Sequence, residues 1–214
     1  MTGSQRTLLM TLFAGGCLAA SPVAAQVYFP QPYLQGSIGV AVPDDADING
    51  GGISGKLKLD SGVDATVALG IHLPFDFRVE GEVGYINADL SKVTVPGVGS
   101  TNLSGEARVY TLMGNVYYDF RNVTPFTPYL GGGLGVAHQH LDNVSVGGIP
   151  VSSGGERDDF AWQLEAGLSF DVLPNLAIVP SYRFLRIENE RTTNGVTVGN
   201  ADTNIFKLGL RLTF

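Results

Sequence analysis

The chain has 214 residues with 13 Lys or Arg and 20 Asp or Glu, so its formal net charge is -7. An acidic chain without a cluster of basic residues does not neutralise phosphates, which excludes nucleic acid as a partner. Glycine is frequent, with 29 residues, and the single cysteine, Cys17, excludes disulfides and thiolate metal sites from the rest of the chain.

Residues 1–25 have the three parts of a secretory signal peptide. Arg6 provides the positive end, an uncharged run follows over residues 8–20, and small residues at 23–25 precede the expected cleavage site. The sequence therefore predicts an exported chain whose mature part covers residues 26–214.

Cys17 would carry a lipid if the chain were a lipoprotein. That interpretation is less favoured, because Ala14 stands where a lipidation motif usually has leucine. A membrane-spanning helix needs about 18 or more uninterrupted apolar residues, and no stretch after residue 25 approaches that length. The sequence predicts an exported protein without a helical anchor.

Eight segments of the mature part alternate apolar and polar residues with a period of two, which is typical of β-strands with two different faces. Each is about ten residues long, the length at which a tilted strand crosses a bilayer. In chain order they cover residues 33–42, 63–72, 77–87, 107–120, 128–139, 160–171, 176–187 and 203–214. The sequence predicts an all-β fold, an eight-stranded antiparallel up-and-down transmembrane β-barrel.

The connections between these segments are alternately long and short. The short connections have the composition of turns and cover residues 73–76, 121–127 and 172–175. The long connections are rich in Gly, Asn, Ser and Asp and cover residues 43–62, 88–106, 140–159 and 188–202. Membrane barrels have short periplasmic turns and long extracellular loops, so we expect the long connections outside the cell and both termini in the periplasm.

The charged residues indicate which face of each strand meets lipid. In the segment 203–214, Lys207 and Arg211 share one face while Leu208 and Leu210 share the other. A water-soluble, lipocalin-like barrel would have to bury such charges and expose continuous apolar rows, which soluble monomers rarely do. The apolar faces are therefore expected to meet hydrocarbon and the charged faces to line the lumen. Closure is expected because an open strand edge in lipid leaves backbone groups without hydrogen bonds.

Aromatic residues are expected to form girdles at the two levels where the apolar band meets lipid headgroups. The predicted girdle consists of Phe77, Tyr118, Phe120 and Phe170 near the turns and Tyr85, Tyr110, Trp162 and Phe184 about one crossing away. The alternative is that these positions reflect only the ordinary preference of aromatic residues for strands.

Pro180 lies inside the segment 176–187. Each strand of a closed barrel has two neighbours, and proline cannot donate the ladder hydrogen bond that one of them needs. The sequence therefore predicts a bulge or irregular pairing around this residue.

Charged residues inside the barrel are expected in two layers. The first layer contains Glu82, Glu165, Arg183 and Lys207, which lie at similar positions along their strands and are therefore expected near the membrane midplane. A buried charge without a partner is costly, so we expect these four side chains to pair across the lumen. Nearer the periplasm, a second polar layer is expected to contain Arg78, Glu80, Asp119, Asp171 and Arg211. The small lumen of eight strands favours a charged plug over the alternative, a gate or narrow ion path.

The end of the chain carries a recognisable pattern. The residues from Lys207 to Phe214 read polar-x-Gly-x-x-apolar-x-aromatic, with Gly209 and Leu212 at the glycine and apolar positions. This pattern resembles the insertion signal of bacterial outer-membrane proteins, which the barrel-assembly machinery reads. The resemblance implies that machinery as a partner during biogenesis.

Two internal stretches carry a further resemblance. Residues 115–120 lead into the glycine-rich stretch 128–135, and residues 181–185 read SYRFL. These stretches are similar to the small eight-stranded outer-membrane barrels of the porin-like, opacity-adhesin and surface-antigen group, and to the outer-membrane protein A barrel domain. The resemblance implies a bacterial outer-membrane location and a role as structural protein, surface antigen or adhesin.

Candidate metal ligands are few. His138 and His140 lie two residues apart at the outer rim, whereas a closed metal site needs about four ligands. The acidic clusters at 44–47 and 156–159 lack the regular spacing of a calcium loop. We expect no metal site and no cofactor.

Some small outer-membrane barrels are lipid-modifying hydrolases or transferases, which need a nucleophile beside a base. His72 is expected to make a lumen hydrogen bond, and no serine accompanies His138 or His140 on their own strand, although Ser169 and Ser181 stay open as nucleophiles. No Gly-x-Ser-x-Gly motif or phosphate-binding loop occurs in the sequence. The sequence predicts no catalytic residues and no enzymatic activity.

The favoured hypothesis is a monomeric outer-membrane barrel with a structural or surface-interaction role. Recognition usually resides on connections held by a rigid scaffold, so a host or surface component is expected to contact the four long connections. Outer-membrane lipid and lipopolysaccharide are the expected surroundings. A narrow channel for ions or small solutes is the second hypothesis, and a lipid-modifying enzyme is the third.

Overall fold

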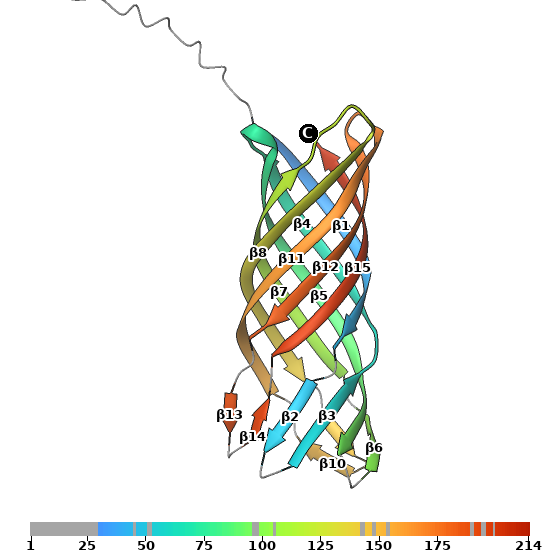
Figure 1. The fold of residues 1–214 in the computed structure, drawn as a ribbon, viewed down its shortest axis with the longest axis vertical. Helices are drawn as coiled ribbons and strands as arrows, with labels where there is room; N and C mark the ends of the chain where they lie inside the picture. The colour runs from blue at the N-terminus through green and yellow to red at the C-terminus, as the bar shows by residue number, and fades with distance from the viewer. Residues whose placement is uncertain are drawn as a thin grey trace, which may run out of the picture.

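The computed structural model describes residues 30–44, 46–50, 53–95, 99–104, 106–141, 144–146, 149–152, 155–188, 191–193, 196–198 and 200–214. The predicted signal peptide, residues 1–25, lies outside these ranges. Within them, no helix is long and apolar enough to cross a membrane. Eight long strands in the described ranges wind around one axis (Figure 1). They are β1 (Gln31–Pro43), β4 (Gly62–His72), β5 (Phe77–Val95), β7 (Glu106–Asp119), β8 (Phe126–Leu141), β11 (Gly155–Leu173), β12 (Leu176–Ile187) and β15 (Ala201–Thr213).

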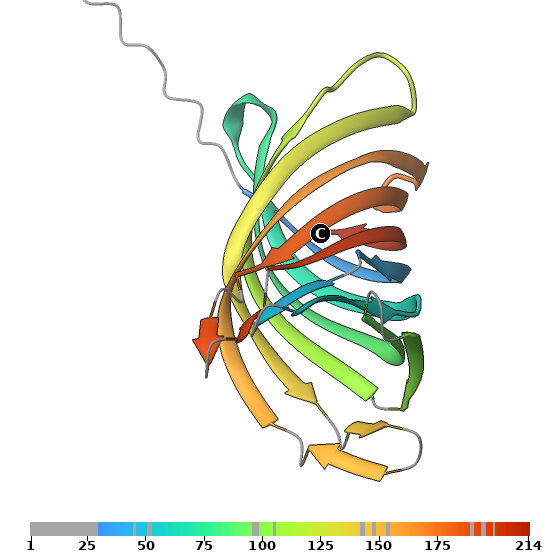
Figure 2. The same ribbon diagram turned by 60° about the horizontal axis from the view of Figure 1, so that its bottom comes forward.

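The long strands form a closed barrel. Each pairs antiparallel with the long strand before it and the one after it in the chain. The first and last strands also pair, from Tyr33 opposite Thr213 to Pro43 opposite Thr203. Figure 2 shows the strands curving around the lumen. The predicted eight-stranded antiparallel up-and-down barrel is therefore confirmed.

The turns at one end are short, as predicted. A single turn of 3-10 helix, η1 (Pro74–Asp76), joins β4 to β5. In the turn between β7 and β8, the Asn122 side chain accepts a hydrogen bond from the Thr124 backbone N–H at 2.8 Å and donates one to the Phe126 carbonyl at 2.9 Å. These local bonds satisfy polar groups that a strand ladder no longer reaches. The turns and the C-terminus lie together at the top of Figure 1.

At the opposite end the structure differs from the prediction of four loops. The strands β5 and β11 have 19 residues each, well beyond the roughly 9–11 residues of one crossing. The long connections contain additional strands: β2 (Ala46–Gly50), β3 (Ile53–Leu59), β6 (Gly99–Ser104), β9 (Val144–Val146), β10 (Ile149–Ser152), β13 (Arg191–Thr193) and β14 (Val196–Val198). The physical reason is that Val, Ile and Thr between the turn-forming residues favour strands once a barrel strand offers an edge to pair with.

The outer face of the barrel is apolar and the inner face is largely polar. Ile38, Leu69 and Leu208 are 68%, 63% and 55% exposed, because they point away from the lumen. Arg78 and Arg183, in contrast, are each 1% exposed and point inward. The predicted sidedness is therefore confirmed, and the apolar rows form a surface suited to hydrocarbon.

Pairing around Pro180 is irregular, as predicted. The ladder between β11 and β12 runs to Gly167 opposite Ser181 and resumes at Phe170 opposite Ile178 in the same register. On its other side Pro180 pairs with Leu208 in a continuous ladder. The interruption on one side is what the missing proline N–H requires, and the unchanged register shows that the irregularity is a gap and not a bulge.

A charged residue on the outer face tests this arrangement. We expect Leu208→Arg, near the membrane midplane, to lower the free energy of folding into lipid vesicles by about 2 to 4 kcal/mol, because the guanidinium must enter hydrocarbon. The control is Val172→Arg, close to the periplasmic turn, where about 0 to 1 kcal/mol is expected. Urea-dependent folding equilibria measure both values. Equal effects at the two depths would contradict the orientation.

Candidate functional site

Four charged side chains meet in the middle of the lumen. Arg183 on β12 contacts Glu82 on β5 and donates from Nε to Glu165 Oε2 on β11 at 3.1 Å. Lys207 on β15 donates to Glu165 Oε2 at 2.8 Å, and its Nζ lies 3.8 Å from Glu82 Oε2. None of these side chains is more than 2% exposed. We call this set the central cluster; it contains the four residues that the sequence places at similar depth.

The central cluster joins strands that are distant in sequence. Glu82 and Arg183 are 101 positions apart, yet the inward alternation of β5 and β12 brings them together across the lumen. Charges removed from water are tolerated when each finds an opposite charge, and removal of one member leaves the others uncompensated. The cluster therefore spans the lumen and links its opposite walls.

Asp64 on β4 is a buried carboxylate that the sequence analysis missed. Its side chain is fully buried, and neither carboxylate oxygen has a hydrogen-bond partner in the described part of the chain. It lies within electrostatic reach of Arg183 and Lys207. With Asp64, three carboxylates face two cations in this region. The alternation of the segment 63–72, which places Asp64 on the inward face, was the sequence signal for it.

The second layer, nearer the turns, is centred on Arg78. Its Nε donates to both carboxylate oxygens of Asp119, at 2.8 and 2.9 Å. The rings of Tyr33, Tyr117 and Tyr129 surround the guanidinium, with centroids 5.5, 4.7 and 5.0 Å from its central carbon. Aromatic faces attract a desolvated cation, so this cage adds to the ion pair. The three tyrosines were not among the predicted site residues, although their inward parity was readable from the sequence.

The other residues predicted for this layer are Glu80, Arg211 and Asp171. Glu80 accepts hydrogen bonds from Tyr33 Oη at 2.8 Å and from Asn115 Nδ2 at 3.1 Å. Arg211 donates from Nε to Gln35 Oε1 at 2.9 Å. Asp171 is exposed at the periplasmic mouth.

Glycines of β8 make room for this packing. A Cβ atom at Gly131 would lie 2.3 Å from Tyr117 Cδ1, and one at Gly133 would lie 1.8 Å from Asn115 Oδ1. Both separations are far below van der Waals contact, so no side chain fits there. The volume that these glycines leave is filled by the neighbouring residues of β7.

Beyond the central cluster the lumen contains a layer of buried apolar side chains. Buried apolar side chains from all around the barrel form one cluster there: Ala41, Ile86, Met113, Ala137, Ala161, Leu185, Ile187 and Ile205. This apolar layer was not predicted. Its members alternate with apolar residues of the outward face, so hydrophobicity does not distinguish the two faces of the strand at these positions. It lies between the central cluster and the long connections, so a charged layer and an apolar layer follow one another along the lumen.

The predicted girdle residues lie in contact with one another at two levels of the outer face. At the turn end, ring centroids are 5.2 Å apart for Phe77 and Tyr118 and 5.0 Å apart for Tyr118 and Phe120. Phe170 stacks at 4.8 Å on Phe126, which the sequence analysis did not include. At the other level the pairs are Tyr85 with Tyr110 at 5.2 Å and Trp162 with Phe184 at 5.6 Å.

The terminal pattern occupies the strand that closes the barrel. Lys207 and Gly209 face the lumen, whereas Leu212 and Phe214 belong to the outward row. A Cβ atom at Gly209 would lie 2.6 Å from Ser37 Oγ on β1. The glycine of this pattern therefore leaves room for the Ser37 side chain of the first strand.

The histidines have carboxylate or backbone partners. His138 Nδ1 lies 2.7 Å from Asp158 Oδ1, and His140 Nδ1 lies 3.4 Å from Glu156 Oε1 on the neighbouring strand. His72 Nδ1 lies 3.3 Å from the Gln31 carbonyl oxygen. Within the described residues, no three His, Cys, Asp or Glu side chains gather into a set that could hold a metal ion.

A closed strand barrel with an apolar exterior, aromatic pairs at two levels and a charged lumen defines a transmembrane β-barrel. The chain belongs to the outer membrane protein beta-barrel domain family, whose sequence profile matches residues 10–214. The protein is accordingly located in the bacterial outer membrane.

Relatives and solved structures agree with this assignment. The outer membrane protein PagN of Salmonella typhimurium is 35% identical over 126 residues, which cover 53% of this chain and 53% of PagN, so the chain spans about half the length of that relative. OprG of Pseudomonas aeruginosa is 18% identical with a TM-score of 0.58, over 86% of this chain and 96% of OprG. Neisserial surface protein A is 23% identical with a TM-score of 0.54, over 86% of this chain and 97% of that protein. At such identity the two structures support the fold alone.

The central cluster generates a stability prediction. Glu82→Leu leaves Arg183 and Lys207 sharing Glu165, so we expect a loss of about 3 to 5 kcal/mol in folding free energy. Glu82→Leu combined with Arg183→Met should recover part of this loss, because the remaining Glu165 and Lys207 still pair.

The control for this experiment is an exposed ion pair. Glu106 Oε2 lies 2.8 Å from Arg108 Nη2, and both side chains are about one-third exposed. Glu106→Gln should therefore change the folding free energy by no more than about 1 kcal/mol. Urea titration in lipid vesicles compares all the variants, and a near-neutral Glu82→Leu would show that the central cluster carries no buried pairing.

Proposed function

We propose that this protein is a non-enzymatic surface-interaction protein whose barrel carries a recognition surface outside the membrane. The observation that carries the proposal is the continuation of the barrel strands into paired strands from all four long connections. Recognition surfaces commonly lie on connections that a rigid scaffold holds in place. The proposed partner is a host or surface component that contacts residues 43–62, 88–106, 140–159 and 188–202.

The pairing of these outer strands supports the proposal. The strand β14 of the fourth connection pairs with β2 of the first, and β3 of the first pairs with the extension of β5. The same extension pairs with β6, which pairs in turn with β9 of the third connection. Figures 1 and 2 place these strands together at the end opposite the turns. Backbone pairing between connections holds them in one arrangement, which favours a defined binding surface over four independent loops.

Arginine-containing ion pairs at the rim of the barrel support contact with lipopolysaccharide as the surrounding lipid. Arg186 and Asp202 form a two-bonded ion pair at 2.6 and 2.5 Å on the outward face, and Arg108 pairs with Glu106 on the other side of the barrel. These pairs lie beyond the outer aromatic level, at the height of polar headgroups. Arginine suits phosphate recognition because its planar fork forms two parallel hydrogen bonds. We include lipopolysaccharide contact at this rim in the proposal.

Biogenesis and assembly complete the proposal. The terminal pattern of β15 would be read by the barrel-assembly machinery after export through the signal peptide of residues 1–25. The barrel would act as a monomer, because closure within one chain leaves no unpaired strand edge in the membrane.

The two layers of the lumen support a plug over the second candidate, a narrow channel. A permeating ion would have to cross the central cluster and then the apolar layer that includes Met113 and Leu185. An apolar constriction opposes ion passage because it offers no substitute for the water that the ion loses. The charged pairs and the apolar layer thus act as barriers in series.

Removal of the outer strands tests the surface role. We expect deletion of residues 46–59 or 144–152 to reduce adherence of bacteria displaying the protein to cultured epithelial cells at least severalfold, because each deletion breaks the paired outer surface. The barrel itself should still form, since its strands are retained, and heat-dependent gel mobility checks this. The matched control is Asn122→Ala in a periplasmic turn, which should leave adherence unchanged. Undiminished adherence after both deletions would refute the surface role.

Planar-bilayer recording tests the lumen. We expect the refolded protein to give no reproducible unitary conductance, because the charged and apolar layers block the path. Leu185→Gly and Met113→Gly open only the apolar layer. These variants should still give no unitary conductance, because the central cluster remains. Unitary conductance of the unmodified protein that disappears with Arg183→Ala would establish the channel in place of the plug.

A further inference from the structure

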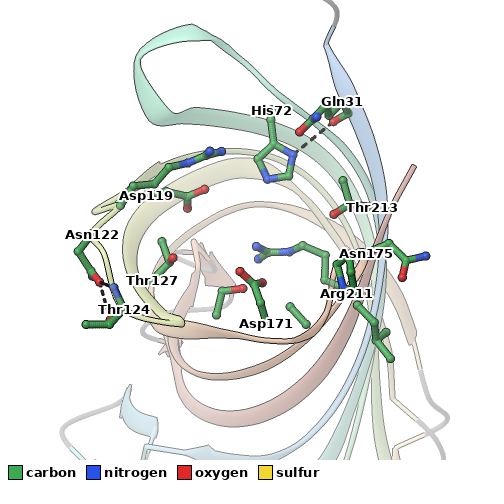
Figure 3. Close-up of a pocket in the computed structure, with 15 residues that line it drawn as sticks. Gln31, His72, Asp119, Asn122, Thr124, Thr127, Asp171, Asn175, Arg211 and Thr213 are labelled. Atoms are coloured by element: carbon green, nitrogen blue, oxygen red, sulfur yellow. Dashed lines mark hydrogen bonds between the residues drawn. The ribbon is translucent and has the colours of Figure 1, made fainter.

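The lumen opens at the turn end into a polar vestibule that the proposed surface role does not use. Its volume is about 360 Å³, and it is lined by the ends of strands from around the barrel (Figure 3). Three ionisable residues of its wall have partners: Asp119 pairs with Arg78, Arg121 with Asp76 at 3.1 Å, and His72 with the Gln31 carbonyl. Of two others, Arg211 bonds only the neutral amide of Gln35, and Asp171 has no side-chain partner among the described residues.

Arg211 is a buried guanidinium held in one orientation with its far edge open. The residue is 5% exposed, and Nε donates to Gln35 Oε1 at 2.9 Å. The rings of Tyr33 and Tyr129 lie 5.1 and 5.7 Å from its central carbon. Among the described residues, no carboxylate pairs with it and no hydrogen bond engages its two Nη atoms. A cation this buried without an ion-pair partner indicates a place for a ligand anion.

Arg78 and Arg211 have similar aromatic surroundings but differ in the charge of their hydrogen-bond partner. Both arginines lie against Tyr33 and Tyr129, and both use Nε for a fixed hydrogen bond. Arg78 meets the carboxylate of Asp119, whereas the corresponding contact of Arg211 is the neutral amide of Gln35. The chain therefore neutralises one of two similar cations and leaves the other facing the vestibule.

Asp171 supplies the opposite charge on the same wall. It is exposed, lines the vestibule, and has no side-chain partner among the described residues. Asp171 on β11 is opposite Ala177 on β12, and Ala177 is opposite Arg211 on β15. Adjacent strands are about 4.8 Å apart, so the Cα atoms of Asp171 and Arg211 are separated by roughly 10 Å, with only the small Ala177 side chain between them. Figure 3 shows both charged side chains directed into the vestibule.

We propose that this vestibule binds a small zwitterion of the amino-acid type. The ligand carboxylate accepts two parallel hydrogen bonds from the Nη atoms of Arg211, the geometry that a guanidinium fork favours. The ligand ammonium group pairs with Asp171, and the ligand lies over Ala177. A simple anion is opposed by Asp171 and a simple cation by Arg211, so a molecule carrying both charges is the best match.

The test is a titration of the protein refolded in detergent micelles, followed by NMR signals of the Arg211 side chain and the Ala177 backbone amide. The probes are glycine, acetate and methylammonium. Glycine should cause saturable shifts and bind at least about tenfold more tightly than either single-charge probe, because each charged hydrogen-bonded contact contributes about 1.5 to 3 kcal/mol. Equal affinity for glycine and acetate, or the absence of saturable shifts, would overturn the proposal.

Variants separate the two charges from the fold. Arg211→Lys keeps the charge and loses the fork, Asp171→Asn removes the exposed carboxylate, and each should weaken glycine binding at least about tenfold. Ala177→Val should weaken it by filling the space between the charges. Arg121→Gln is the matched control, because that arginine lines the same vestibule but is 55% exposed and already paired. Loss of glycine binding in Arg121→Gln, or its retention in Asp171→Asn, would count against the site. Because Asp171 is exposed, the Asp171→Asn variant is expected to fold normally, and its binding result is independent of changes in the barrel interior.

Discussion

The absence of water from the bilayer interior is the constraint on which this structure depends. Every backbone N–H and C=O group at membrane depth needs a partner within the protein, and only closure supplies one for the outermost strands. Here closure is the pairing of β1 with β15, which brings Gly209 against Ser37. Once the ring is closed, the two faces of each strand have fixed surroundings. Apolar side chains meet lipid, and polar side chains have no place except the lumen.

The polar and charged side chains in the lumen then need hydrogen-bond or ion-pair partners there. Most of its charges meet an opposite charge, as Arg78 does with Asp119 and Arg183 with Glu82 and Glu165. Asp64 and Arg211 depart from this rule in different ways. Asp64 is enclosed beside the central cluster, whereas Arg211 faces a vestibule that is open to the periplasm. Because only the second is accessible from solution, an unpaired charge has a functional interpretation there that an enclosed one lacks.

The parts of this structure that sequence predicts are those that depend on alternation along a single strand. The segment 176–187 coincides with β12, and parity with depth along the strands was enough to place Glu82, Glu165, Arg183 and Lys207 together. Contacts between side chains of different strands could not be predicted from the sequence, because they depend on the tilt and stagger of the closed barrel. The tyrosine cage of Arg78 and the apolar layer are of this kind. The extension of β5 to Val95 was missed because one of its pairing partners, β3, comes from another connection.

The two ends of the barrel are mechanically connected through the central cluster. Its two carboxylates, Glu82 and Glu165, lie on β5 and β11, the strands of 19 residues that continue farthest beyond the membrane. The same β5 pairs with β3 and β6 outside, and Arg183 and Lys207 hold its membrane part to the opposite wall. A strand fixed at its middle by buried ion pairs positions its projecting end more firmly than one held by neighbours alone. The charged lumen thus holds in place the strands that project beyond the membrane, which a wide water-filled pore could not do.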